Sequence, residues 1–86
     1  MEIKTSSGFD EKVDKLCRKN KPLGRLIDQK LRILSVFPKH PSLRLHKIES
    51  KFDAWSISVN PKLRILFVYR SYGILLIDIG SHDQVY

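Results

Sequence analysis

Apolar residues change their spacing along the chain near residue 43. Before that point they recur every three to four residues, which is the spacing of a helix that buries one face. After it, apolar and polar residues alternate and β-branched and aromatic side chains become frequent, as in strands. The pattern therefore predicts two helices followed by several strands. The helical apolar positions are Phe9, Val13, Leu16 and Cys17, then Leu23, Leu26, Ile27, Leu31 and Leu34.

Turn-forming residues divide this pattern into elements. Residues 2–5 form a short first strand, Pro22 suits the first turn of the second helix, and the two prolines within 37–42 require a loop. Further strands are predicted at 43–48, 54–60, 63–69 and 73–79. The last is almost continuously apolar, as a central strand covered on both faces would be. Gly80 ends the sheet, and 81–86 is a polar tail.

This order predicts one α+β domain spanning residues 1–86. A short N-terminal strand is followed by two antiparallel helices, which pack on one face of a curved, mainly antiparallel sheet of four to five strands. The opposite face is expected to stay open for a ligand.

Composition narrows the range of functions. The apolar runs are too short to span a bilayer and the start of the chain carries no secretory leader pattern, so a cytoplasmic protein without membrane contact is expected. Cys17 is the only cysteine and is assigned a buried structural position. The three histidines are scattered and no phosphate-binding glycine loop is present, so neither a metal site nor a small-molecule cofactor is predicted.

The positive charge is concentrated in one stretch. The whole chain has a formal net charge of +7, but residues 12–51 contain twelve Lys and Arg against three Asp and Glu, a net charge of +9. Such a field favours a polyanion or an acidic partner protein, although a solvated surface that aids solubility has the same composition.

Four stretches together resemble a known family. They are HKI at 46–48, DAWSISVN at 53–60, LRILF at 63–67 and LIDIGSHDQVY at 76–86. With the order of elements, they are similar to the RelE/StbE and YafQ-like branch of the RelE/ParE toxins. The similarity extends from about residue 9 to the C-terminus. One departure is Ser50, where many relatives have glycine, in a hairpin that is about one residue shorter here.

The resemblance implies a RelE-like fold and a type II toxin–antitoxin toxin. Such a toxin is a ribosome-dependent, metal-independent mRNA endoribonuclease that leaves a 2′,3′-cyclic phosphate and a 5′-hydroxyl. Its expected partners are the ribosome, mRNA and a cognate antitoxin, which would cover the basic groove or displace the tail at 80–86. The alternatives are a ParE-like toxin that inhibits DNA gyrase without catalysis, and a homologue that only binds its antitoxin.

The resemblance also assigns catalytic residues. Arg64 matches the family's strand arginine, and its neighbours in sequence should point to the opposite face of the sheet. It is assigned phosphate binding and transition-state stabilisation, and the alternative is a structural ion pair with Asp78. His82 matches a C-terminal histidine and is assigned proton transfer, unless it only caps the last turn. Tyr86 matches a terminal aromatic that stacks on a base or orients the phosphate, unless it only anchors the tail.

The general base is the open assignment. His46 is the first candidate, and His40 and Glu49 are the substitutes. Trp55 alternates with core positions and is interpreted as core packing rather than base stacking. The residues expected to hold RNA are Lys39, His40, Arg44, Lys47 and Lys51.

Overall fold

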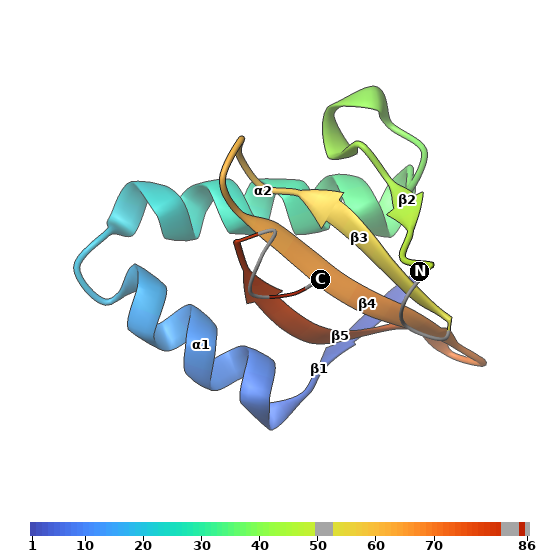
Figure 1. The fold of residues 1–86 in the computed structure, drawn as a ribbon, viewed down its shortest axis with the longest axis horizontal. Helices are drawn as coiled ribbons and strands as arrows, with labels where there is room; N and C mark the ends of the chain where they lie inside the picture. Colours follow the sequence, from blue (N-terminus) through green and yellow to red (C-terminus); the bar gives the residue numbers. More distant parts are fainter. Residues whose placement is uncertain (50–52, 82–84, 86) are drawn as a thin grey trace.

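The computed structural model describes residues 1–49, 53–81 and 85. Figure 1 shows two helices against one mixed sheet, and the strand order is β1-β5-β4-β3-β2. β1 is parallel to β5, whereas the other three neighbouring pairs are antiparallel. The predicted α+β fold is therefore confirmed. The elements are β1 (Glu2–Thr5), α1 (Ser7–Cys17), α2 (Lys21–Val36), the 3-10 helix η1 (Pro41–Leu43), β2 (His46–Lys47), β3 (Ala54–Ser58), β4 (Arg64–Arg70) and β5 (Gly73–Gly80).

Side-chain caps fix where the two helices begin. Ser6 Oγ accepts a hydrogen bond from the backbone N–H of Phe9 at 3.1 Å at the start of α1. Asn20 Oδ1 accepts one from Leu23 N at 3.2 Å at the start of α2, where Pro22 occupies the first turn. Each cap satisfies an N–H group that has no partner inside the helix. The chain therefore changes direction at Asn20, between the two helices, so that both helices can pack against the same sheet.

The main hydrophobic cluster lies between the helices and the sheet. Ile65 and Phe67 of β4 are fully buried in it, as is Leu34 of α2. Trp55 and Leu63 are partly buried and pack against the same cluster. The other members of the cluster are Phe9, Ile27, Leu43, Ile57, Val59, Ile74, Leu76 and Ile79.

The opposite face of the sheet is less open than predicted. Ile48, Ala54 and Val68 are buried there in a second cluster, with Leu75 and Ile77 packed against it. The polar residues Ser56, Ser58 and Arg64 lie on this face toward the other end of β3 and β4, and the exposed Arg70 follows Val68 at the near end. The uncovered part of the face is therefore smaller than the alternation alone implied.

The strand predicted at 43–48 is wrong at its beginning. Only His46–Lys47 pairs as β2, and Leu43 is buried at the end of η1. His40 caps η1 because its Nδ1 accepts from Ser42 N at 3.1 Å, and Arg44 ends it with a left-handed φ of 48°. A left-handed residue cannot continue a strand, so the extended chain begins later.

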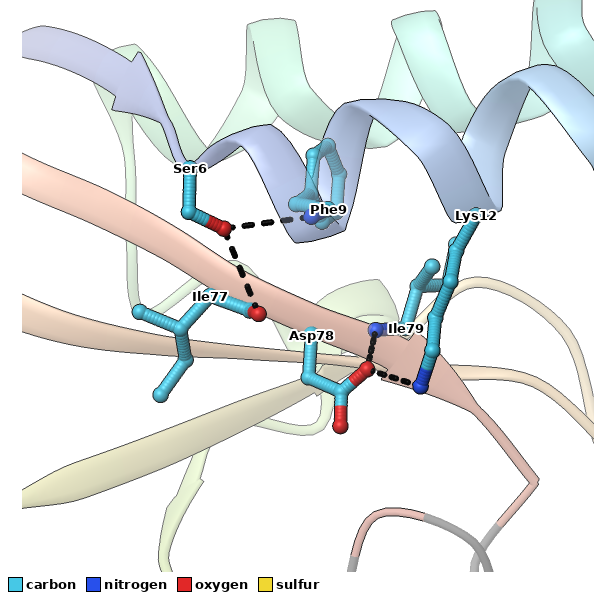
Figure 2. A network of polar contacts seen from close by, with 6 residues as sticks. All are labelled: Ser6, Phe9, Lys12, Ile77, Asp78 and Ile79. Carbon is cyan, nitrogen blue, oxygen red and sulfur yellow. Dashed lines mark hydrogen bonds and ion pairs between the residues drawn. The ribbon is translucent and has the colours of Figure 1, made fainter.

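The start of α1 is tied to the middle of β5, as Figure 2 shows. Ser6 Oγ donates to the carbonyl of Ile77 at 3.4 Å, and Lys12 Nζ forms an ion pair with Asp78 Oδ1 at 2.6 Å. The same carboxylate oxygen accepts from Ile79 N at 2.9 Å. These contacts lie where the register between β4 and β5 shifts, and they hold the helix over the irregular part of the strand. Among the described residues, neither helix combines the length and the apolar character needed to cross a bilayer.

Candidate functional site

Three polar side chains meet on the face of the sheet away from the helices. β2 and β3 pair His46 directly with Ser56, and β3 and β4 pair Ser58 with Arg64. Because side chains on one face of a sheet alternate along each strand, Arg64 lies diagonally across from Ser56. Three neighbouring strands thus bring an imidazole, a hydroxyl and a guanidinium together.

The guanidinium of Arg64 is held by hydrogen bonds to its neighbours. Its Nε and Nη2 donate to Ser56 Oγ at 3.1 and 3.0 Å, and Nη2 also lies 3.2 Å from the backbone oxygen of Arg44. The next residue, Ile65, is fully buried in the main cluster on the other face. A half-buried guanidinium with a fixed orientation can bind a phosphate through two parallel hydrogen bonds.

His46 contacts the same group of atoms. Its Nδ1 is 3.2 Å from Arg64 Nη2 and 3.3 Å from the oxygen of Arg44, and its Nε2 is 3.4 Å from Ser56 Oγ. A guanidinium nitrogen only donates, so the contact with Arg64 requires a free lone pair on Nδ1. In that tautomer the proton is on Nε2, whereas a hydrogen bond from Nδ1 to the oxygen of Arg44 places the proton on Nδ1, so the contacts of the ring fit both neutral tautomers. In either tautomer one ring nitrogen is a proton acceptor within this cluster.

Ser56 was missed by the sequence prediction. It is the only buried polar residue in the part of the chain that the structure describes, with 0% of its surface exposed. A lone serine between Trp55 and Ile57 belongs to no motif, but the alternation does place it on the face of Arg64. A small polar residue on the same sheet face as a strand arginine is the signal that could have found it.

The other predicted RNA contacts are not gathered in this cluster. Lys39, His40 and Arg44 line one pocket with Trp55, whose side chain is on the opposite face of the sheet from Arg64, and the carbonyl of Arg44 reaches Arg64. Lys47 pairs with Trp55 in the sheet register, so it faces the opposite side of the sheet from His46. The structure therefore does not bring Lys47 next to the proposed base.

The remaining predicted site residues lie mostly outside the described part of the chain. Lys51, His82 and Tyr86 lie outside the described residues, as does the departure at Ser50, so their roles stay predictions. Glu49 is exposed in a turn after β2.

Two of the alternatives can be compared with contacts in the structure. The alternative partner of Arg64, Asp78, forms its ion pair with Lys12 instead (Figure 2). Trp55 is half-buried, and its ring makes an edge contact with Tyr69 at a centroid distance of 5.8 Å. It packs against the core and borders a pocket at the same time.

Metal-binding residues are not clustered in the described part of the chain. There, no group of three or more His, Cys, Asp or Glu side chains lies close enough to hold an ion. The one resolved change in acidity is away from the site: burial, and then the charge of Asp14, raises the pKa of the Cys17 thiol. The functional groups at the candidate site are therefore a guanidinium, an imidazole and a hydroxyl.

Comparison with known proteins gives likeness in structure only. No family model matches the sequence, and no curated protein matches it either. A YoeB/ParE toxin from Agrobacterium tumefaciens matches 95% of this chain and 99% of its own, with a TM-score of 0.81 and 13% identity. A metal-bound toxin from Helicobacter pylori matches 100% and 99%, with a TM-score of 0.83 and 21% identity.

A third match comes from a toxin–antitoxin complex. The structure of the DinJ–YafQ complex from E. coli matches 99% of this chain and 96% of its own, with a TM-score of 0.78 and 16% identity. The coverage is nearly complete in all three comparisons, so the whole domain is alike and not one motif of it. The chain therefore has the RelE-like fold of the YoeB, YafQ and related toxins.

Proposed function

We propose that this chain is the toxin of a type II toxin–antitoxin pair, and that it is an endoribonuclease which cuts mRNA on the ribosome without a metal ion. Its RelE-like fold supports the toxin role. The observation that carries the nuclease role is the 3.2 Å contact between Arg64 Nη2 and His46 Nδ1. A cation and a proton acceptor at this distance can act on one phosphodiester together.

The proposed reaction uses the RNA's own 2′-hydroxyl as the nucleophile. His46 removes its proton, and the 2′-oxygen attacks the neighbouring phosphorus while the bond to the 5′-oxygen breaks. Arg64 stabilises the negative charge that builds up on the phosphorane oxygens, and His82 supplies the proton for the leaving 5′-oxygen. The products are a 2′,3′-cyclic phosphate and a 5′-hydroxyl. Tyr86 is assigned to base stacking or to orienting the phosphate.

The resting contacts of Arg64 fit this role. Its donors contact a neutral hydroxyl, a backbone oxygen and the imidazole of His46, at 3.0 to 3.2 Å. A phosphate oxygen is an anionic acceptor and forms shorter and stronger bonds to a guanidinium than neutral acceptors do. Substrate binding can therefore draw Nη2 away from His46 and leave the imidazole to act as the base.

The partners follow from the fold and the charge. Structural neighbours include YoeB with YefM and YafQ with DinJ, so a cognate antitoxin is proposed here as well. The net charge of +9 over residues 12–51 suits both an acidic antitoxin and the RNA of the ribosome. The cytoplasm is the proposed location.

Mapping the 5′ ends of cellular mRNA after induction tests the activity. Wild-type chain should create new ends, and Arg64→Gln should reduce their number by about 10²-fold or more, as is typical when a positioned transition-state donor is lost. Arg70→Gln is the matched control, because Arg70 lies on the same strand and its Nη1 donates to the backbone oxygen of Tyr69. Intact mRNA with arrested DNA replication would refute the nuclease and support a gyrase inhibitor. Intact mRNA without growth arrest would leave only antitoxin binding.

A further inference from the structure

The 3-10 helix η1 begins with a cap that a histidine side chain provides. His40 Nδ1 lies 3.1 Å from Ser42 N and 2.9 Å from Ser42 Oγ. A backbone nitrogen only donates, so Nδ1 is the acceptor and carries no proton in this contact. The imidazole of His40 is therefore tied to the segment between α2 and β2, which is the green part of the ribbon in Figure 1.

This cap satisfies the one amide of η1 that needs a side-chain acceptor. Pro41 has no N–H group, and the N–H groups of Leu43 and Arg44 donate to backbone oxygens at 3.0 and 3.2 Å. The N–H of Ser42 lies in the first turn, where a helix supplies no backbone acceptor of its own. Without the imidazole, this N–H would have to bond to water or leave the helical geometry.

The other end of η1 has a strained backbone. Arg44 has a φ of 48° and a ψ of 49°, a left-handed conformation that residues with a side chain adopt only where the surrounding structure holds them. Leu43 is fully buried beside it, and Lys30 Nζ of α2 lies 3.4 Å from the oxygen of Ser42. Together with the His40 cap, these contacts hold η1 and therefore the conformation of Arg44.

The left-handed conformation brings the carbonyl of Arg44 into the candidate site. Its oxygen lies 3.2 Å from Arg64 Nη2 and 3.3 Å from His46 Nδ1. If the cap is lost, Arg44 can relax toward the extended backbone that residues with a side chain prefer, and its oxygen then moves away from the guanidinium. A chain of contacts thus runs from His40 through η1 to Arg64.

We propose that His40 is a positioning residue for the candidate site, and that its imidazole caps η1 so that the carbonyl of Arg44 stays on Arg64 and His46. The inference rests on the proposed nuclease function and gives His40 a role other than that of a general base. While Nδ1 accepts from Ser42, the proton of the neutral ring is on Nε2. The capped ring therefore has no free lone pair with which to remove a proton.

Two substitutions of His40 separate the cap from the imidazole. Asparagine is among the best capping residues and accepts from the N–H two residues further on, whereas alanine has no acceptor. His40→Asn should therefore cleave mRNA at the wild-type rate in a ribosome-containing translation reaction. His40→Ala should be slower by roughly 2- to 30-fold, which is the effect of one lost cap on a rate.

The matched control loses a cap far from the site. Asn20 Oδ1 caps the start of α2, whereas η1 follows the end of that helix. Asn20→Ala should lower the urea midpoint of unfolding, as His40→Ala should, because each variant loses one capping bond. Its cleavage rate should stay that of the wild type under conditions in which the chain is folded.

The guanidinium can also be observed without RNA. The side-chain N–H signals of Arg64 in proton–nitrogen correlation spectra are identified by their loss in Arg64→Gln. They should shift in His40→Ala and stay at the wild-type positions in His40→Asn and Asn20→Ala. Shifted signals in a chain that creates no new mRNA ends would keep the link from His40 to Arg64 and remove the enzyme. New mRNA ends with unshifted signals in His40→Ala would keep the enzyme and overturn the link.

The cleavage rates can overturn the proposal as well. Equal losses in His40→Asn and His40→Ala would give the imidazole a direct part in proton transfer or RNA binding. A wild-type rate in His40→Ala would mean that the site does not depend on the cap. Should His40→Ala fail to fold, His40→Asn decides alone: a wild-type rate with unshifted Arg64 signals supports the cap, and a change in either contradicts it.

Discussion

Ser56→Ala removes one oxygen atom from the centre of the candidate site. The hydroxyl is fully buried and accepts from both Nε and Nη2 of Arg64. After the substitution Nη2 keeps its contacts with the backbone oxygen of Arg44 and with His46 Nδ1, whereas both hydrogen bonds to the hydroxyl are lost. The guanidinium then keeps its charge and is held less tightly in its present orientation.

The magnitude follows from the type of bond. A hydrogen bond to a charged group contributes about 1.5–3 kcal/mol, and both bonds here end on one oxygen, so the loss should stay within that range. Domains of this size have a free energy of unfolding of roughly 4–13 kcal/mol, so the change is a large fraction of it. If the same energy is lost from the transition state, cleavage falls by about 10- to 150-fold.

Two assays read these effects separately. Urea unfolding followed by Trp55 emission gives the change in stability, and mRNA cleavage in a ribosome-containing translation reaction gives the change in rate. Ser58→Ala is the matched control, because that hydroxyl lies on the same strand and donates to the backbone oxygen of Asn60 at 3.0 Å. Should Ser56→Ala unfold at the wild-type urea concentration and cleave as fast as Ser58→Ala, the role given to Ser56 is wrong.

Two other regions give predictions that do not depend on the nuclease. Gly73→Ala should lower the free energy of unfolding by about 3 kcal/mol or more in urea titrations, because φ is 146° and the new Cβ would lie 2.2 Å from the backbone oxygen of Glu2. Gly8→Ala is its control: no atom lies within 4 Å of that Cβ, so stability should stay equal or rise by up to about 1 kcal/mol, and a loss equal to that of Gly73→Ala would contradict the argument. Burial raises the pKa of the Cys17 thiol and the charge of Asp14 raises it further, so alkylation by iodoacetamide should require a higher pH than for free cysteine. Asp14→Asn should move the pH dependence of the alkylation rate to lower pH. Because the folded state binds the thiol proton more tightly than the unfolded state does, this proton stabilises the fold below the unfolded pKa, and the stabilisation is lost as the pH rises through the raised folded pKa. A urea midpoint that increases over that pH range would contradict the raised pKa.

Strand β5, which has a neighbour on each side, shows what the sequence predicts well. The almost continuous apolar run at 73–79 predicted coverage on both faces. Ile74 and Leu76 are in the main cluster and Leu75 and Ile77 pack on the second, so both faces of β5 are indeed covered. Periodicity succeeds here because the apolar side chains at 74–77 all pack against one of the two hydrophobic clusters.

The segment after α2 shows where periodicity fails. Alternation at 43–48 predicted a strand, but Leu43 is buried in a 3-10 helix and only His46–Lys47 pairs. The competing interactions are local, since the side chain of His40 caps the helix and Arg44 ends it with positive φ. A histidine cap and a left-handed arginine are not visible in a hydrophobic pattern, because neither residue type is typical of its position.

The candidate site was also predicted only in part. The face on which Arg64 lies follows from strict alternation, and the sequence predicted it correctly as the face opposite Ile65. The hydroxyl of Ser56 and the carbonyl of Arg44 were not predicted, although both lie within 3.2 Å of the guanidinium. Contacts made by a backbone oxygen depend on φ and ψ of one residue and not on its side chain.

The carbonyl of Arg44 shows this dependence. Because η1 ends at Arg44 in the left-handed conformation, with a φ of 48°, this oxygen lies 3.2 Å from Arg64 Nη2 and 3.3 Å from His46 Nδ1. A residue in the ordinary extended conformation would follow the direction of β2 and would point its carbonyl elsewhere. The orientation of the guanidinium thus depends in part on a single positive φ just before β2.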